Sequence, residues 1–222
     1  MIVTMHQPEH LPWLGFFHKM AMADLYVVMD DFQYRHQYFQ NRNRIQGVTT
    51  PIWLTVPVRK EEHRYRLIKD VRIDNSRNWR KSYWTSISYQ YHKAPYYNRY
   101  AKDLEVIVLE PWEHLIDFNL VLIDYFREVL NIDTPMVRCS VLDVTGVQSE
   151  AIHHACLATD ASCYLSGPSG RDYLDESLFA ASGIEVRYDH FDHPIYPQAG
   201  KKEFTPLLST LDLIMNCGPE SR

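Results

Sequence analysis

The sequence predicts an α/β protein with a mostly parallel central sheet flanked by helices, either Rossmann-like or nucleotidyltransferase-like. Short apolar runs typical of buried strands alternate with longer stretches of helical periodicity, and this alternation predicts parallel strands joined by crossover helices. Hydrophobic residues make up 45% and charged residues 23% of the chain, which is the composition of a folded protein with a sizeable core. No repeat or linker divides the sequence. We therefore expect a single domain over residues 1–222, with residues 60–110 as a candidate inserted or lid-like region.

The first elements form a strand–helix–strand unit. Residues 2–6 read as a short buried strand that stops before Pro8, because proline cannot donate to the strand ladder. Residues 13–22 follow another proline and predict a helix with proline at its first turn. Residues 25–29 predict a second buried strand, so the connection should be a right-handed parallel crossover.

The middle of the chain is less regular. Residues 50–58 predict an edge strand interrupted by prolines, and residues 67–73 are its candidate partner. Residues 76–103 are polar and aromatic and contain helical stretches. Residues 111–130 place their apolar side chains on one face, which indicates an amphipathic helix.

The last third returns to the alternation of strands and helices. We expect strands at residues 137–144, 163–166 and 184–188. We expect helices at residues 149–157, with Ser149 as N-cap, at residues 171–181, closed by Gly183, and at residues 206–216.

Composition and charge exclude several classes of protein. The first ten residues carry no basic leader, and no apolar run approaches the ~18–20 residues that span a bilayer, so we expect neither a secretory signal nor a membrane span. The four cysteines show no CxxC pairing, which favours reduced thiols and a cytoplasmic location. The net charge of −5 argues against a nucleic-acid partner. A small anionic or nucleotide-linked substrate fits the basic residues between positions 35 and 80, and the oligomeric state is not predicted.

Polar clusters follow the predicted strands at three places, and ligands of open α/β sheets bind beyond the carboxyl ends of the strands. The candidate catalytic residues are His6, Asp30 and Asp31. The candidates for substrate binding are Gln7, His10, Gln40, Asn41, Arg42, Asn43, Arg44, Ser166, Gly167, Ser169, Gly170 and Arg171. This coincidence of clusters and strand ends predicts one shared site.

Each candidate has a chemical and a purely structural interpretation. His6 suits phosphate binding or acid–base chemistry near neutral pH, or it caps a strand end by hydrogen bonding. Asp30 or Asp31 suits a hydroxyl, an amine or Mg²⁺, or it caps a turn or helix. Arg42 and Arg44 suit bidentate binding of a phosphate or carboxylate, or they belong to a charged surface loop.

The Ser-Gly-Pro-Ser-Gly segment at residues 166–170 precedes a predicted helix, whose first N–H groups suit an anion, although such turns are also common without ligands. No metal ligand is assigned. The spacing of His6 and His10 resembles a zinc pair, but the prolines around them forbid the helix that would align both side chains. For His190, Asp192 and His193 we favour a strand-end cap over a metal site.

Distinctive segments are distributed along nearly the whole chain. They are HQPEHLPWLGFF (6–17), DLYVVMDDFQY (24–34), QNRNRI (40–45), WLTVPV (53–58), YLSGPSGRDYL (164–174), YPQ (196–198) and FTPLLSTLDLIMNCG (204–218). In these segments the sequence resembles the WbqC-like protein family. The resemblance implies a role in the biosynthesis of surface polysaccharides such as O-antigen, or of natural products, with aminoacyl or glycyl transfer onto an amino sugar as one suggested activity. It carries over no catalytic residue.

The order of a strand, a histidine-bearing loop, a helix, Ala23-Asp24 and an apolar strand also looks like the start of nucleotidyl-transferring enzymes such as pantothenate synthetase. Those enzymes activate a carboxylate with ATP and join it to an amine, although the glycine between their two histidines is missing here. The resulting hypothesis is an aminoacyl or acyl transferase, or an ATP-dependent amide ligase, with ATP and Mg²⁺ as candidate cofactors. The alternative is a non-catalytic protein that binds a sugar nucleotide or a partner enzyme. A glycosyltransferase fits less well, because Asp30-Asp31 is not a DxD motif.

Overall fold

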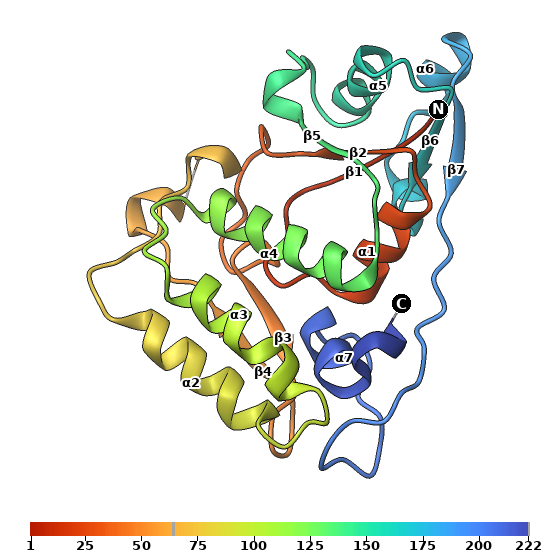
Figure 1. Cartoon of the computed structure of the whole chain (residues 1–222). Coiled ribbons are helices and arrows are strands. Elements are labelled where there is room, and N and C mark those ends of the chain that lie inside the picture. Colours follow the sequence, from red (N-terminus) through yellow and green to blue (C-terminus); the bar gives the residue numbers. More distant parts are fainter. Residues whose placement is uncertain (64, 222) are drawn as a thin grey trace. The chain divides into compact units, whose positions relative to one another are not determined.

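The computed structural model describes residues 1–63 and 65–221, except for the side chains of residues 62 and 63 (Figure 1). The chain divides into two compact units, each built from three separate segments. The first unit contains Met1–Pro8, Gly15–Phe32 and Ile132–Asp192, and the second contains Glu9–Leu14, Gln33–Asn131 and His193–Arg222. The expectation of a single domain remains a prediction, since compact units and domains are not the same thing.

The first unit holds the central sheet. Its strands are β1 (Ile2–His6), β2 (Leu25–Val28), β5 (Met136–Arg138), β6 (Cys163–Ser166) and β7 (Glu185–Tyr188). Its helices are α1 (Leu14–Ala21, from Gly15 onward in this unit), α5 (Ser149–Ala158) and α6 (Glu176–Ala181), with 3₁₀ turns η3 (Cys139–Val141) and η4 (Pro168–Asp172). Within the described residues the sheet has five strands in the order β5-β2-β1-β6-β7, and all pairs are parallel. The predicted α/β class with a parallel sheet flanked by helices is confirmed.

The strand order reverses beside β1. From β1 the chain moves outward to β2 and then β5, and it returns across the sheet to place β6 and then β7 on the other side of β1. This is the order that defines a topological switch point in Rossmann-like sheets, and it lies between β1 and β6. The two strands pair in register from Ile2 with Cys163 to Thr4 with Leu165.

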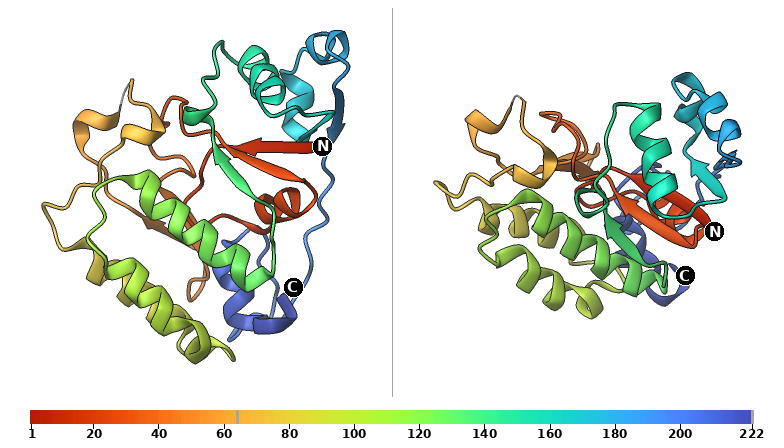
Figure 2. Two further views of the ribbon diagram at one scale, coloured as in Figure 1. Left: turned by 45° about the horizontal axis from the view of Figure 1, so that its top comes forward. Right: turned by 90° about the horizontal axis from the view of Figure 1, so that it is seen from above.

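The two faces of the sheet are covered by different helices (Figures 1 and 2). Val3 and Met5 of β1 point to one face, where they join a buried cluster with residues of α5 and α6. On the other face Phe16 of α1 packs against Tyr26 of β2, with ring centroids 5.4 Å apart. Alternating side chains of β1 therefore point to opposite helical layers, as the period of a strand requires.

The second unit combines a β-hairpin with helices. The hairpin pairs β3 (Arg42–Ile45) with β4 (Ile52–Thr55) in antiparallel register. The helices are α2 (Trp79–Tyr91), α3 (Tyr97–Leu109), α4 (Leu115–Leu130) and α7 (Thr210–Cys217), with 3₁₀ turns η1 (Lys60–His63), η2 (Ile68–Asp70) and η5 (Gly218–Ser221). Figures 1 and 2 show α2, α3 and α4 side by side in this unit.

Most predicted elements are present, with four clear differences. The strand expected over residues 137–144 is limited to β5 at Met136–Arg138, because Cys139–Val141 form the 3₁₀ turn η3. The helix expected over residues 171–181 begins at Glu176, because the Asp175 carboxylate caps it by accepting from the Ser177 N–H, and residues 168–172 form η4 instead. Ser149 does not cap α5, since its hydroxyl donates to the Tyr173 carbonyl. Residues 67–73 contain the turn η2 rather than a strand that pairs with β4, and Ile73 forms an isolated bridge with Val58.

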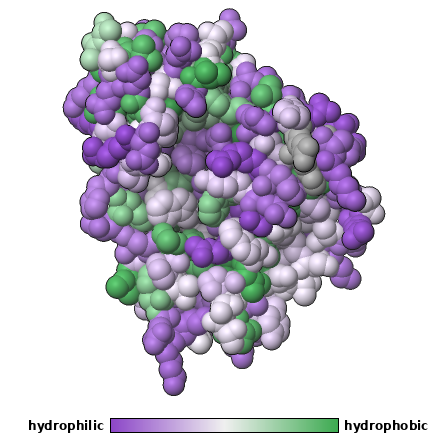
Figure 3. All heavy atoms as spheres, turned by 180° about the vertical axis from the view of Figure 1, so that it is seen from behind, coloured by the Kyte–Doolittle hydropathy of each residue, from purple (hydrophilic) through white to green (hydrophobic). Residues whose placement is uncertain are grey.

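No helix in the described part of the chain is both long and apolar enough to cross a bilayer. On the face drawn in Figure 3, hydrophobic residues are interspersed among hydrophilic ones.

Candidate functional site

The carboxyl edge of the first unit's sheet gathers side chains from three neighbouring strands. β1 ends at His6, β6 ends at Ser166, and Asp189 follows the end of β7. The Asp189 N–H donates to the Ser166 carbonyl at 2.7 Å, which ties the ends of β6 and β7 together. Because this edge contains the switch point between β1 and β6, it is the position where an open α/β sheet would bind a ligand.

His6 is a neutral imidazole at the end of β1. Burial, and next the positive charge of Lys19, lower the pKa of His6 to about 4. Its Nδ1 lies 2.9 Å from the Gln7 carbonyl, so the proton is assigned to Nδ1 and the lone pair to Nε2. Its ring meets the edge of Phe16 at 5.5 Å. A neutral ring of this kind can accept a hydrogen bond, but it does not supply the positive charge expected of a phosphate ligand.

The positive charge beside His6 comes from Lys19 of α1. This lysine is 5% exposed, and its Nζ donates to the Met5 carbonyl at 3.0 Å, at the end of β1. A lysine so deeply buried is unusual, and in a low dielectric its charge acts strongly on neighbouring anions. Nothing in the sequence singled out Lys19, because a lysine in an amphipathic helix usually lies in solvent.

A second histidine at this edge, His18 of α1, contacts a carboxylate. His18 Nδ1 lies 3.1 Å and 3.3 Å from the two carboxylate oxygens of Asp189. The His18 side chain is 36% exposed, whereas that of Asp189 is 9% exposed. A carboxylate that accepts from Nδ1–H fixes the tautomer and leaves the Nε2 lone pair for a proton from a substrate. The pair is therefore built like an acid–base unit.

Neither member of this pair was among the residues predicted from the sequence. Asp189 follows a predicted strand directly, so the argument that selected Asp30 at the end of β2 applies to it equally. His18 left no such signal, because it lies inside a predicted helix and far from Asp189 in the sequence.

The Ser-Gly loop after β6 is folded on itself. The Ser166 hydroxyl donates to the Gly167 carbonyl at 3.1 Å, and the Gly170 N–H donates to the same carbonyl at 3.0 Å. Ser169 is exposed, and the Arg171 guanidinium lies 4.0 Å from the centre of the Tyr188 ring. The expected helix start with open N–H groups is wrong at this position, because η4 and the Asp175 cap replace it.

The two aspartates at the end of β2 differ in environment. Asp30 is fully buried, and its carboxylate accepts from Arg138 Nε at 2.6 Å, from the Ser140 N–H at 2.9 Å and from the Ser140 hydroxyl at 2.7 Å. Asp30 therefore fastens the end of β5 and the turn η3 to the end of β2, which is a structural role rather than a catalytic one. Asp31 is half-buried, and of the two aspartates it remains the candidate for binding an amine, a hydroxyl or Mg²⁺.

Four polar candidates lie inside the second unit and bond to protein groups. His10 is fully buried, with Nδ1 2.9 Å from Asn119 Oδ1 and Nε2 2.6 Å from the Tyr83 hydroxyl. Gln40 Oε1 accepts from the Arg35 N–H, and the amides of Asn41 and Asn43 donate to the carbonyls of residues 56 and 11. Buried polar side chains with such partners hold loops in place. We therefore leave these four out of the proposed substrate contacts.

Arg42 and Arg44 share the outward face of β3. The Arg42 guanidinium lies 4.3 Å from the centre of the Trp53 ring on β4, and that of Arg44 lies 5.9 Å from it. Arg44 pairs with Trp53 across the hairpin. The two arginines are thus partly exposed cations arranged on an aromatic ring.

Metal ligands do not cluster in the described part of the chain, where no group of three or more His, Cys, Asp or Glu side chains could hold a metal ion. His190 and Asp192 lie 3.3 Å apart and are almost fully exposed. Burial raises the pKa of the Cys156 thiol to about 12, so this cysteine is not a nucleophile at neutral pH.

Comparison with known proteins shows similarity over nearly the whole chain. A 221-residue alignment with the uncharacterized protein Rv1507c of Mycobacterium tuberculosis (strain ATCC 25618 / H37Rv) shows 31% identity and covers 99% of this chain and 95% of that protein. No solved structure matches the chain significantly. The model of the WbqC-like protein family matches residues 7–222, which span both units. The chain belongs to the WbqC-like protein family.

Proposed function

We propose that the protein is a transferase that forms an amide bond by moving an aminoacyl (glycyl) or other acyl group onto an amino sugar or a related amine. The reaction belongs to cytoplasmic steps in the assembly of a surface polysaccharide such as O-antigen, or of a natural product. Membership of the family supports a biosynthetic role. The observation that carries the reaction type is the His18–Asp189 pair at the carboxyl edge of the sheet.

Amide formation needs a group that removes a proton from the attacking amine. The amine nitrogen forms a bond to the acyl carbonyl carbon, and its proton passes to Nε2 of His18. The Asp189 carboxylate stabilises the resulting imidazolium through Nδ1–H. The bond from the carbonyl carbon to the leaving group then breaks, and the leaving group takes the electron pair and receives the proton from His18.

The donor in this proposal is an activated acyl group, such as an acyl phosphate, an acyl adenylate or an ester. The Lys19 ammonium lies beside His6 at the end of β1. Its positive charge there favours an anionic leaving group. ATP would supply the activation in the ligase form of the hypothesis. Mg²⁺ typically binds through one or two carboxylates and the substrate phosphates, and Asp31 is the carboxylate we assign to it.

The test is turnover by purified protein with amino acids, ATP and nucleotide-linked amino sugars, followed by product mass. His18→Asn and Asp189→Asn should each reduce the rate by at least about a hundredfold, the usual contribution of a positioned acid–base group. His92→Asn is the control, because His92 is exposed and lies in the other unit.

Product formation that is equally fast in His18→Asn and wild-type protein would refute the assigned role of the pair. Thermal stabilisation by sugar nucleotides without any product would instead support the non-catalytic binding protein.

A further inference from the structure

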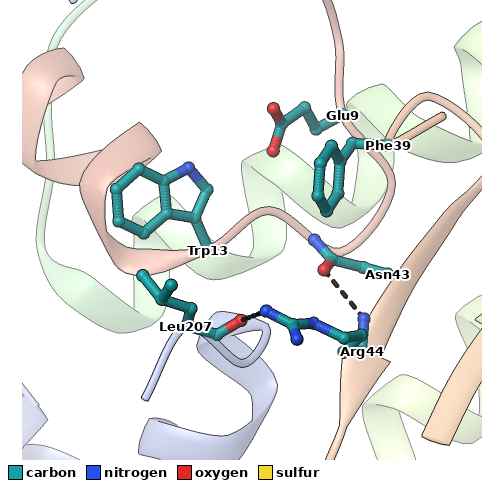
Figure 4. A pocket seen from close by; sticks show the side chains of 6 residues that line it. All are labelled: Glu9, Trp13, Phe39, Asn43, Arg44 and Leu207. Carbon is teal, nitrogen blue, oxygen red and sulfur yellow. Dashed lines mark hydrogen bonds between the residues drawn. The ribbon is translucent and has the colours of Figure 1, made fainter. Parts of the chain in front are cut away.

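The second unit contains a pocket of about 330 Å³ that the proposed amide transfer does not use. It is lined by Glu9, Trp13, Phe39, Asn43, Arg44 and Leu207 (Figure 4). Figure 4 shows the Trp13 indole and the Phe39 ring on opposite sides, the Glu9 carboxylate between them, and the Arg44 guanidinium along the edge near Leu207. All six residues belong to the second unit, so its geometry is defined within one compact body.

The walls of the pocket come from chain segments that are held together by backbone hydrogen bonds. The His10 N–H donates to the Phe39 carbonyl at 2.8 Å, and the Thr210 N–H donates to the Pro12 carbonyl at 2.8 Å. The Ser209 N–H donates to the Arg44 carbonyl at 2.9 Å. These contacts fix the segments that carry Glu9, Trp13 and Leu207 against β3. The pocket is therefore preformed, which lowers the entropic cost of binding.

Arg44 has hydrogen-bonding capacity to offer a ligand. Its Nη2 donates to the Leu207 carbonyl over a long 3.3 Å, while its Nε is buried and has no hydrogen-bond partner in the described part of the chain. Asn43 differs, because its Nδ2 donates to the Leu11 carbonyl and its Oδ1 accepts from the Arg44 N–H. Asn43 thus forms part of the wall, and Arg44 supplies the donors.

Opposite charges and aromatic walls define the chemistry of the ligand. Glu9 is only 7% exposed, and its carboxylate projects between the rings of Trp13 and Phe39, so a ligand in this pocket meets a negative charge at low dielectric. An ammonium group forms a charge-assisted hydrogen bond with that carboxylate, and an anionic group pairs with the guanidinium of Arg44. A hydrocarbon or pyranose body suits the space between the rings of Trp13 and Phe39. The volume is at the small end of ligand pockets, which run from about 300 to 1,000 Å³, and fits a monosaccharide or an amino acid.

We propose that this pocket binds a small zwitterion, with its ammonium group at Glu9 and its carboxylate or phosphate at Arg44. Free amino acids and amino-sugar phosphates both have this chemistry, and the experiment below separates them. The inference does not depend on amide transfer, because its site and its readout are different from those of the His18–Asp189 pair.

Binding is measured by titration calorimetry on the full-length protein, with glucosamine 1-phosphate, glycine and L-leucine as zwitterionic probes. Glucose 1-phosphate lacks the ammonium group and glucosamine lacks the anion, so each omits one predicted contact. Removing either charge should weaken binding at least about tenfold, since a charge-assisted hydrogen bond is worth roughly 1.5–3 kcal/mol and each 1.4 kcal/mol is tenfold. Stronger binding of the amino acids or of the sugar phosphate identifies the source of the ligand.

Glu9→Gln and Arg44→Gln should weaken binding of the zwitterion by a similar factor. Arg42→Gln is the matched control, because Arg42 occupies the same face of β3 and also lies over Trp53 but does not line the pocket. The affinity of the Arg42→Gln protein for the zwitterion should stay within about twofold of wild type, as expected for a residue that does not contact the ligand. Absence of saturable binding for every zwitterion, or equal affinity for the probes that lack one charge, would overturn the proposal. The probe comparison uses wild-type protein and is independent of any folding defect in a variant.

Discussion

At the scale of single residues, His10 illustrates how a hydrogen-bond chain fixes a protonation state. The Asn119 amide donates its Nδ2–H to the Gln40 carbonyl at 2.8 Å, so its Oδ1 faces His10 as an acceptor. Nδ1 of His10 therefore carries the proton, and Nε2 accepts from the Tyr83 hydroxyl. Burial, the largest effect, lowers the pKa of His10 to about 4. The neutral imidazole satisfies both hydrogen bonds of this relay, and burial is what disfavours its protonated form.

This relay makes stability depend on pH in a defined direction. Below the unfolded-state pKa of 6.5 the unfolded chain binds a proton at His10, whereas the folded chain does so only near pH 4. The stabilisation is therefore present above pH 6.5 and is lost as the pH falls towards 4, by up to about 3 kcal/mol. His6 acts in the same direction, because its pKa is also lowered to about 4. Urea unfolding at several pH values measures the loss.

His10→Gln should reduce the slope of stability against pH, and His92→Gln, at an exposed position, should leave it unchanged. An unaltered slope in His10→Gln would contradict the relay. If that variant folds poorly, an NMR titration of wild-type protein provides the same test, and a His10 pKa near 6.5 would be the contrary result.

Residue types at strand ends could be predicted from the sequence, but their partners could not. The sequence located His6 and Asp30 correctly at the ends of β1 and β2. It did not reveal that the Asp30 carboxylate accepts hydrogen bonds from Arg138 and Ser140, which lie more than a hundred positions away in the sequence. Long-range partners decide whether a polar side chain is part of the scaffold or is available for a ligand. His18 was missed for the same reason.

At the scale of elements, the close packing of η4 against the end of β6 depends on a glycine in η4. A Cβ atom at Gly170 would overlap the Ser166 Oγ, whereas one at Gly167 would meet nothing within 4 Å. We expect Gly170→Ala to lower the free energy of unfolding by about 1–3 kcal/mol through overpacking, and Gly167→Ala to change it by less than about 0.5 kcal/mol. Chemical denaturation measures both changes.

The double variant tests the cause of that effect. Ser166→Ala removes the overlapping oxygen, so it should recover part of the loss caused by Gly170→Ala, giving a clear interaction energy in a double-mutant cycle. Purely additive effects would mean that the stability loss in Gly170→Ala does not come from overlap with the Ser166 hydroxyl. The cycle also reports whether this loop at the carboxyl edge is rigidly packed or can rearrange around an added methyl group.

Elements with strong apolar patterns were predictable, and those defined by pairing were not. β1 and β6 were placed at their observed bounds, because buried parallel strands are nearly continuous apolar runs. β3 was not predicted as a strand, since its Arg-Asn-Arg-Ile sequence has little apolar character and its partner β4 provides the pairing. Helix α6 was predicted too long, because the cap at Asp175 competes with the helical pattern that precedes it.

At the scale of the whole molecule, each compact unit is assembled from segments that are distant in the sequence. The last segment, from His193 onward, belongs to the second unit and brings α7 with it. Asp212 of α7 is fully buried and accepts from the hydroxyls of Tyr91 and Tyr196, both at 2.9 Å, and from Gln198 Nε2 at 2.7 Å. Tyr91 comes from α2, so this carboxylate joins elements that are far apart in the chain.

Removal of residues 193–222 should therefore unfold the second unit rather than shorten it. The truncation would leave the Tyr91 hydroxyl buried without Asp212, and it would remove the Ser209 and Thr210 backbone donors that hold β3 and the segment from Glu9 to Leu14. Each buried polar group left without a partner costs roughly 1–3 kcal/mol, so a few such losses exhaust a typical folding stability of about 5–15 kcal/mol. Hydrogen exchange on the chain of residues 1–192 measures this directly. Amides of α2, α3 and α4 should lose their protection, and full protection of these helices would show that the C-terminal segment is dispensable for the second unit.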